Sequence, residues 1–284
     1  MSADCCFSTL LSAAQRGWLA CDGDEALLSL ALPIEGIDPL LALPQLAEQE
    51  SLQVLWDSAP GLCLAAAGPC QELELAGSRR FEQAQRFADL CLSRLHDTAA
   101  DSPAHARPRV LLRFRFFDQV SERRRSEAVV PSVQAVLPRW QLSRQGRRGW
   151  LRLNGVVSSA ADCRELAEQL WLKHEQLLKT PATPTPLKPQ ALVAATEPET
   201  WRQRYAAALT RGIDLVNSGD LHKLVLAVRH RIVLADTFDP LPLLKRLRRQ
   251  QAGSCRFLWQ RHTGDAFFGA SPERLLSLRA GWLR

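Results

Sequence analysis

The chain has 284 residues, of which 46% are hydrophobic and 23% are charged, so it can bury a large core and is not expected to be disordered. No apolar run reaches the roughly 20 residues that a membrane-spanning helix needs, which predicts a soluble protein with no membrane partner. The formal net charge of +6 comes from short arginine clusters, which we interpret as solvated faces because no nucleic-acid-binding motif accompanies them: Arg123 to Arg125, Arg147 with Arg148, and Arg246 with Arg248 and Arg249.

The N-terminus and the cysteines both favour a cytoplasmic protein. No Lys or Arg precedes Arg16, so the start of the chain lacks the basic character of a secretory or organellar leader. The eight cysteines are scattered and form no C-x-x-C pair. A metal site or a disulfide framework is therefore not expected, and we predict reduced, mostly buried thiols.

The first region is predicted to mix strands and helices. Short apolar runs predict strands at residues 25–32 and 52–55, and apolar residues at three- and four-residue spacing predict a helix over residues 78–96. Residues 110–117 alternate, which predicts a half-solvated strand with the apolar Leu112, Phe114 and Phe116 inward and Arg113 outward. A turn at residues 143–147 leads into a return strand from Trp150.

A proline-rich segment divides the chain. A helical pattern from Ala160 to Lys179 is followed by four prolines within residues 180–189, which can neither continue a helix nor join a sheet. We therefore predict an N-terminal α+β region at residues 1–190 and a second region at residues 191–284. A capping box at residues 196–199 opens the next helix, which closes near Gly219.

The second region is predicted to continue as a strand (221–234), a helix (239–251) and strands at 255–261, 266–270 and 275–279. Neighbouring strands joined by short turns indicate antiparallel sheets with outer helices. The fold class is therefore predicted to be α+β.

Two ionisable residues stand at the edges of apolar strand-like runs, where charge is costly unless chemistry or a partner requires it. Lys223 would share a strand face with Val225 and Ala227, which would desolvate the ammonium and lower its pKa. Glu273 follows an apolar run whose cover would raise a carboxyl pKa. On their own, these residues could equally be a lysine that reaches solvent and a turn carboxylate paired with an arginine.

The motifs around these residues, L-H-K-L-V-L-A at Lys223 and F-F-G-A-S-P-E-R-L at Glu273, resemble those of the chorismate-utilising enzymes. Within that family the likeness is greatest to isochorismate synthase of menaquinone or phylloquinone biosynthesis. The resemblance covers residues 201–284 and implies the chorismate-binding fold that component I of anthranilate synthase also has. It also implies chorismate as the substrate, Lys223 as general base and Glu273 as general acid.

The implied reaction is isomerisation of chorismate to isochorismate, in which water is added at C2 and the C4 hydroxyl is lost. Relatives that use ammonia typically carry glutamine at the position of Lys223. The resemblance further implies Mg2+ to hold a substrate carboxylate, with ligands expected downstream of residue 284. The sequence identifies neither the substrate-binding residues nor the oligomeric state.

Two departures from the family pattern lead to alternatives. Val228 stands where the family has arginine, and the strand at residues 275–279 is followed by only a few residues, so we expect the fold to be incomplete at the C-terminus and this chain to be inactive alone. One alternative is a salicylate-, anthranilate- or aminodeoxychorismate-forming relative. The other is a non-catalytic remnant or interaction module.

Overall fold

A computed structural model describes residues 3–21, 25–47, 52–58, 61–118, 131–179, 191–195, 198–227, 231–262, 265–273, 278–279 and 282–283. The chain forms two compact units, the first made of Met1–Thr185 with Pro240–Arg284 and the second of Pro186–Asp239. The predicted boundary at residue 190 falls near the first limit between these units, but the chain returns to the first unit at Pro240. The predicted linker at residues 180–189 lies outside the described residues.

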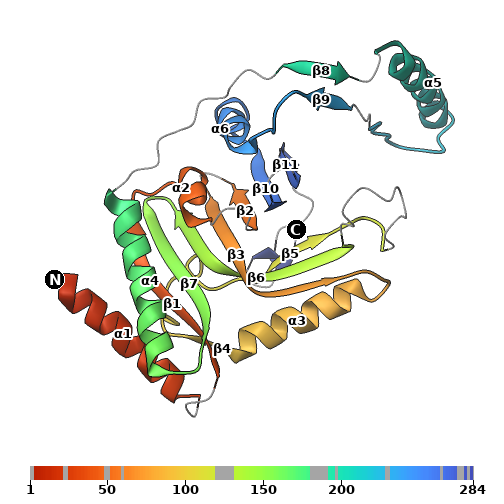
Figure 1. Cartoon of the computed structure of the whole chain (residues 1–284). Helices are drawn as coiled ribbons and strands as arrows, with labels where there is room; N and C mark the ends of the chain where they lie inside the picture. Colours follow the sequence, from red (N-terminus) through yellow and green to blue (C-terminus); the bar gives the residue numbers. More distant parts are fainter. Residues whose placement is uncertain are drawn as a thin grey trace. The chain divides into compact units, whose positions relative to one another are not determined.

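The first unit is built on one mixed sheet. Its strand order is β11-β10-β2-β3-β6-β7-β1-β4, and β5 also pairs with β6 (Figure 1). All neighbours are antiparallel except β1 and β4. The strands are β1 (Ala26–Glu35), β2 (Gln53–Asp57), β3 (Leu62–Leu75), β4 (Leu95–Asp97), β5 (Leu111–Phe114), β6 (Val133–Gln145), β7 (Arg148–Val157), β10 (Cys255–His262) and β11 (Asp265–Ser271).

Helices lie on both faces of this sheet. Helices α1 (Ala3–Leu19) and α4 (Ala160–Lys179) pack together against β1 and β7, and α2 (Pro39–Leu46) packs on β2 and β3. Helix α3 (Arg80–Arg94) packs on β3 and β6, and α6 (Pro240–Gln250) on β10 and β11. The alternation of β1 separates the two faces, because Leu28 and Leu30 enter the main core with α1 and α4 whereas Leu27 lies on the α3 side.

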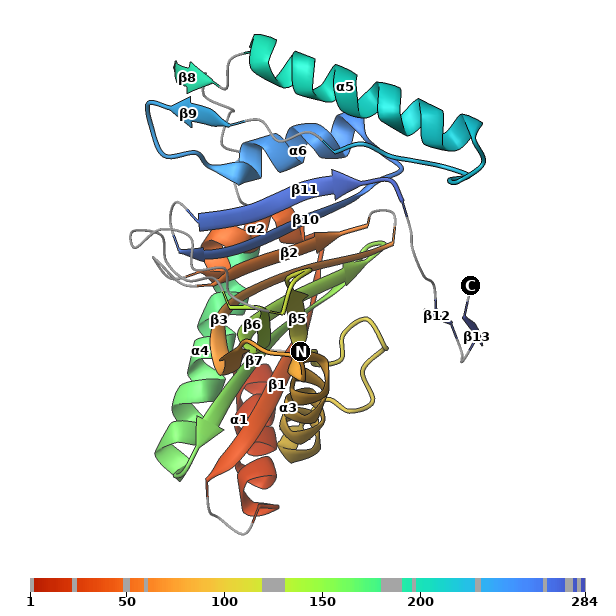
Figure 2. The ribbon, with the colours of Figure 1, turned by 90° about the vertical axis from the view of Figure 1, so that its right-hand side faces the viewer.

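Two strands from the C-terminal part of the chain extend one edge of this sheet, beyond β2. Strand β10 pairs with β2 from Arg256↔Asp57 to Gln260↔Gln53, and with β11 on its other side. Figure 2 shows β11, β10 and β2 following one another along the sheet. The predicted α+β class is therefore confirmed, and it includes one sheet shared by segments almost 200 residues apart in sequence.

A buried arginine fixes the polar part of the α3-side face. Arg152 on β7 is fully buried, and its guanidinium donates to Asp97 at 2.6 Å, to the Ser29 hydroxyl at 2.7 Å and to the Ala106 carbonyl at 3.1 Å. Ser29 in turn donates to Asn154. These contacts satisfy a charge that would otherwise be costly to bury, and they hold the connection after β4 against the sheet.

The second unit contains α5 (Pro198–Asn217) and a two-stranded sheet of β8 (Leu192–Ala195) and β9 (Ile232–Leu234). The predicted helix that ends near Gly219 is confirmed, and Gly219 has a φ of 82°. The predicted strand over 221–234 is wrong at its start, because residues 221–227 pair with no described strand. Residues 228–230, which include Val228, lie outside the described residues.

The orientation predicted for the strand at residues 110–117 is also wrong. In β5, Leu112 and Phe114 are exposed whereas Arg113 is half-buried. The guanidinium of Arg113 lies 5.7 Å from the centroid of the Phe267 ring of β11. This cation–π contact gives the arginine a partner inside the unit. The exposed Phe114 packs against Phe81 of α3, with the two ring centroids 4.7 Å apart and the rings tilted by 33°.

The last described residues form a short hairpin. The few residues that follow the strand predicted at 275–279 do pair with it, because β12 (Leu278–Arg279) pairs with β13 (Trp282–Leu283) over two residues. Within the described ranges, no helix has the length and apolar character needed to cross a membrane.

Candidate functional site

Lys223 lies in an irregular segment just after α5. The helix closes with a hydrogen bond from the Leu221 amide to the Leu215 carbonyl at 3.0 Å, and the chain then turns back along the helix. Lys223 is exposed in this unit, as is Val225. A lysine that acts as a base needs burial to favour the neutral amine. The described residues of the second unit do not bury Lys223 in this way.

Alternate side chains of this segment anchor it to α5. Leu224 and Leu226 line a hollow of about 320 Å³ with apolar residues of the helix, including Ile213 and Val216. Leu224 packs directly over Gly212, where an added Cβ would lie 2.5 Å from Leu224 Cδ2. Glycine therefore permits the close approach that fixes the residue next to Lys223.

Glu273 follows the end of β11 in the first unit. Its side chain is exposed, and its backbone carbonyl accepts a hydrogen bond from the Ser271 hydroxyl at 3.3 Å. The preceding strand is fixed by a close cross-strand contact, because the Phe257 ring covers Gly269 and would lie 3.0 Å from an added Cβ there. Strand β11 thus fixes the backbone just before Glu273. The apolar run was predicted to bury the Glu273 carboxylate, but this side chain is exposed in the first unit.

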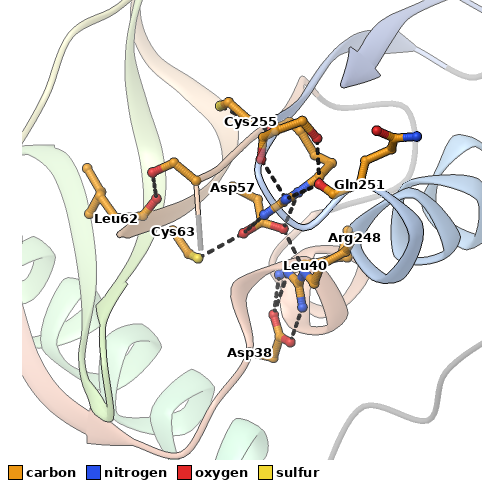
Figure 3. Close-up of polar contacts among 11 residues, drawn as sticks. Asp38, Leu40, Asp57, Leu62, Cys63, Arg248, Gln251 and Cys255 are labelled. Atoms are coloured by element: carbon orange, nitrogen blue, oxygen red, sulfur yellow. Dashed lines mark hydrogen bonds and ion pairs between the residues drawn. The ribbon is translucent and has the colours of Figure 1, made fainter. Parts of the chain in front are cut away.

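A buried ion-pair cluster holds β10 and α6 to the N-terminal part of the sheet (Figure 3). Asp57 at the end of β2 is fully buried and contacts Arg256 of β10 at 3.1 Å and Arg248 of α6 at 2.6 Å. The Cys63 thiol donates to the same carboxylate at 3.0 Å. Arg248 also pairs with Asp38, which caps the N-terminus of α2 through the Leu40 amide.

These partners set the ionisation of Asp57. Burial alone would raise the pKa of this carboxyl group, but hydrogen bonds from Arg256 and Cys63 and the charge of Arg248 outweigh it and lower the pKa to about 2. The Cys63 thiol shows the opposite effect, since burial and the neighbouring Asp57 raise its pKa to about 11. The cluster is thus a carboxylate held by two arginines, with a neutral thiol beside it.

This cluster was not predicted from the sequence. Arg248 was predicted to lie on a solvated face, which is wrong, because its guanidinium bridges two carboxylates. The local signals were weak: Asp57 closes an apolar strand and Arg256 opens another, each a charge placed where a half-buried strand would carry an apolar residue.

The two predicted catalytic residues belong to different units, Lys223 to the second and Glu273 to the first. Their function as an acid–base pair therefore stays a prediction. No group of three or more His, Cys, Asp and Glu side chains with metal-binding geometry occurs among the described residues, so none of these residues is assigned to Mg2+.

An α+β fold with one mixed sheet and helices on both of its faces is shared with known proteins. The chain matches the family described as chorismate binding enzyme over residues 12–284, and it therefore belongs to the chorismate-binding enzyme family. This confirms the resemblance predicted from the motifs at Lys223 and Glu273.

Two relatives show the extent of the likeness. The chain is 27% identical over 256 residues to the salicylate biosynthesis isochorismate synthase of Pseudomonas aeruginosa, a match that covers 90% of this chain and 52% of that protein. It resembles the structure of MenF, the menaquinone-specific isochorismate synthase from Escherichia coli, with a TM-score of 0.57 and 19% identity over 93% of this chain and 56% of that one. The second likeness shows the fold alone, and the chain spans about half the length of both relatives.

We predict that Asp57→Asn destabilises the first unit by about 3–5 kcal/mol at pH 7, because it leaves the buried Arg256 without its counter-ion. The pKa of Asp57 is lowered from 3.8 to about 2 on folding, so its ionisation stabilises the fold above about pH 4 and this contribution is lost as the pH falls through 2. The difference between wild type and variant should shrink by about 2 kcal/mol over that range. Urea unfolding at pH 6 and pH 2.5 measures the free energy of unfolding of wild type and variant, and Asp89→Asn, at an exposed position, is the control. A difference between wild type and Asp57→Asn that does not change with pH would contradict the prediction.

A second prediction concerns the segment that carries Lys223. Gly212→Ala should displace Leu224 from α5 and shift its methyl resonances, because the new Cβ occupies the space of Leu224 Cδ2. Gly253→Ala is the matched control, since nothing lies within 4 Å of a Cβ there. Unchanged Leu224 methyl resonances in Gly212→Ala would show that Leu224 does not anchor the segment.

Proposed function

We propose that this protein is an isochorismate synthase that converts chorismate to isochorismate. The observation that supports this most is the presence of Lys223 and Glu273 at the two motif positions of a chain that matches the chorismate-binding enzyme family over residues 12–284. The sequence relative named above, from Pseudomonas aeruginosa, is an isochorismate synthase, which supports the same choice within the family.

In this proposal Lys223 is the general base and Glu273 the general acid. The neutral amine of Lys223 removes a proton from the water that attacks C2, and the protonated Glu273 carboxyl gives a proton to the C4 hydroxyl as it leaves as water. One water is consumed and one is released, so the reaction is an isomerisation. Burial would favour both the neutral amine of Lys223 and the protonated carboxyl of Glu273. In this proposal, bound substrate or other parts of the protein exclude water from the two side chains.

Other parts of the proposal rest on the family resemblance. Mg2+ would hold a carboxylate of chorismate, but the described residues provide no ligand set for it, so no step above depends on the metal. Use of the product in menaquinone or phylloquinone biosynthesis and a cytoplasmic location stay predictions.

The base is tested by Lys223→Ala in the protein as it is produced from its gene, assayed with chorismate and Mg2+ by chromatography of the products. We expect the rate of isochorismate formation to fall by about 10²- to 10⁴-fold, as is usual when a general base is removed. Lys179→Ala, which removes an exposed lysine of α4, should leave the rate unchanged. Near-normal turnover by Lys223→Ala, or anthranilate or salicylate as the wild-type product, would contradict the proposal.

The acid is tested separately by Glu273→Gln, which keeps the shape and hydrogen bonding of the side chain but removes the transferable proton. We expect kcat to fall while KM stays within about threefold of wild type, because the proton is needed chiefly as the C4 oxygen departs. Steady-state kinetics distinguishes the roles: a change in KM alone would make Glu273 a binding residue.

A further inference from the structure

A second hollow lies in the first unit, between α3 and the sheet, and takes no part in the proposed reaction. It has a volume of about 440 Å³, which falls in the range of small-molecule sites. Its floor is formed by Leu27 of β1 and Val156 of β7, which are paired in register. Its wall is formed by Phe87 and Leu90 of α3.

The apolar surface of this hollow is incompletely covered. Leu90 is 48% exposed and Val156 is 42% exposed, although both belong to elements whose other faces pack in the core. Along α3, Phe87, Leu90 and Cys91 recur at the spacing of one helical face, so that face of the helix is turned toward the hollow. A ligand with an apolar body would remove this surface from water.

Three polar side chains of different character also line the hollow: Arg94, Glu25 and Gln71. Among the described residues, none of these three side chains forms a hydrogen bond or an ion pair, whereas Arg86, two turns before Arg94 on α3, pairs with Glu82 at 2.7 Å. Arg94 is exposed to solvent and lines the hollow, about one helical turn after Leu90 and Cys91. Its positive charge also opposes the rise in the pKa of the Cys91 thiol that burial causes.

We propose that this hollow is a binding site for a small carboxylic acid with a compact apolar body. Arg94 binds the carboxylate, because a guanidinium pairs with carboxylates through two charge-assisted hydrogen bonds. Leu27, Val156 and Leu90 contact the apolar body, and Gln71 and Glu25 accept hydrogen bonds from a hydroxyl or amino substituent. Neither Lys223 nor Glu273 is among the residues that line the hollow, and the proposal does not depend on the function proposed above.

The test compares three probes with the same ring and different charge: benzoate, benzyl alcohol and benzylamine. In calorimetric titration of the 284-residue chain we expect benzoate to bind at least about tenfold more tightly than the other two, the effect of one charge-assisted contact. Arg94→Gln should abolish this preference, and Arg86→Gln on the same helix should keep it. Equal binding of the three probes, tighter binding of benzylamine, no binding, or an unchanged preference in Arg94→Gln would overturn the proposal.

A second measurement locates the site in the wild-type chain, so it does not depend on whether a variant folds. Cys21 and Cys91 line the hollow, whereas Cys255 lies on β10 outside it. Cys21 and Cys255 are both half-buried, whereas Cys91 is buried and has a raised thiol pKa, so the measurement uses Cys21 with Cys255 as control. Benzoate should slow alkylation of Cys21 by iodoacetamide at least threefold, read by mass spectrometry, and leave Cys255 unchanged. Equal alkylation rates of Cys21 with and without benzoate would overturn the assignment of the site.

Discussion

The structure of the first unit depends on one buried carboxylate. Asp57 is fully buried on β2, and its two arginine partners come from β10 and α6, at sequence separations of 199 and 191 residues. Because an unpaired buried charge is strongly destabilising, Asp57 cannot be removed without leaving the buried Arg256 without its counter-ion. The cluster therefore makes the association of the two distant segments specific, beyond what apolar contact between them requires.

Strands β10 and β11 link this ion-pair cluster to the candidate catalytic residue Glu273. Strand β10 enters the sheet beside β2, and β11 follows it with Gly269 beneath the Phe257 ring. The S-P-E motif begins where β11 ends, so the position of Glu273 in the first unit is determined by a strand that the N-terminal half of the chain holds in place. This explains physically why a motif near residue 273 requires the long sequence that precedes it.

Local patterns in the sequence predicted the elements well and their association poorly. Helix α4 was predicted with its observed bounds, and β10 and β11 to within one residue at each end, because apolar periodicity and turn residues are properties of short segments. The insertion of β10 beside β2 and the ion pairs of Asp57 were not predicted, since contacts between distant residues leave no regular spacing. The strand β5 was predicted with the wrong face inward because its arginine finds an aromatic partner, Phe267, from the far end of the chain.

The candidate site shows the same limit. Lys223 and Glu273 were predicted from their places at the edges of apolar runs and from the motifs around them. Both side chains are exposed within their own units, so the described structure does not supply the burial that was expected of them. The segment of Lys223 was predicted as a strand from its apolar alternation; alternate residues do anchor it, but to α5 through Leu224 and not to a neighbouring strand.

Asp57 holds the hairpin of β10 and β11 and the N-terminal strands of the sheet together as one cooperative structure. Native-state hydrogen exchange tests it most directly, through the amides of Phe257 and Leu258 on β10 and of Leu64 and Ala65 on β3. We predict that these amides exchange with the same free energy of opening and the same dependence on denaturant, because the strands open together. If the β10 amides exchanged through a separate opening of lower free energy while those of β3 stayed protected, the claim would be contradicted.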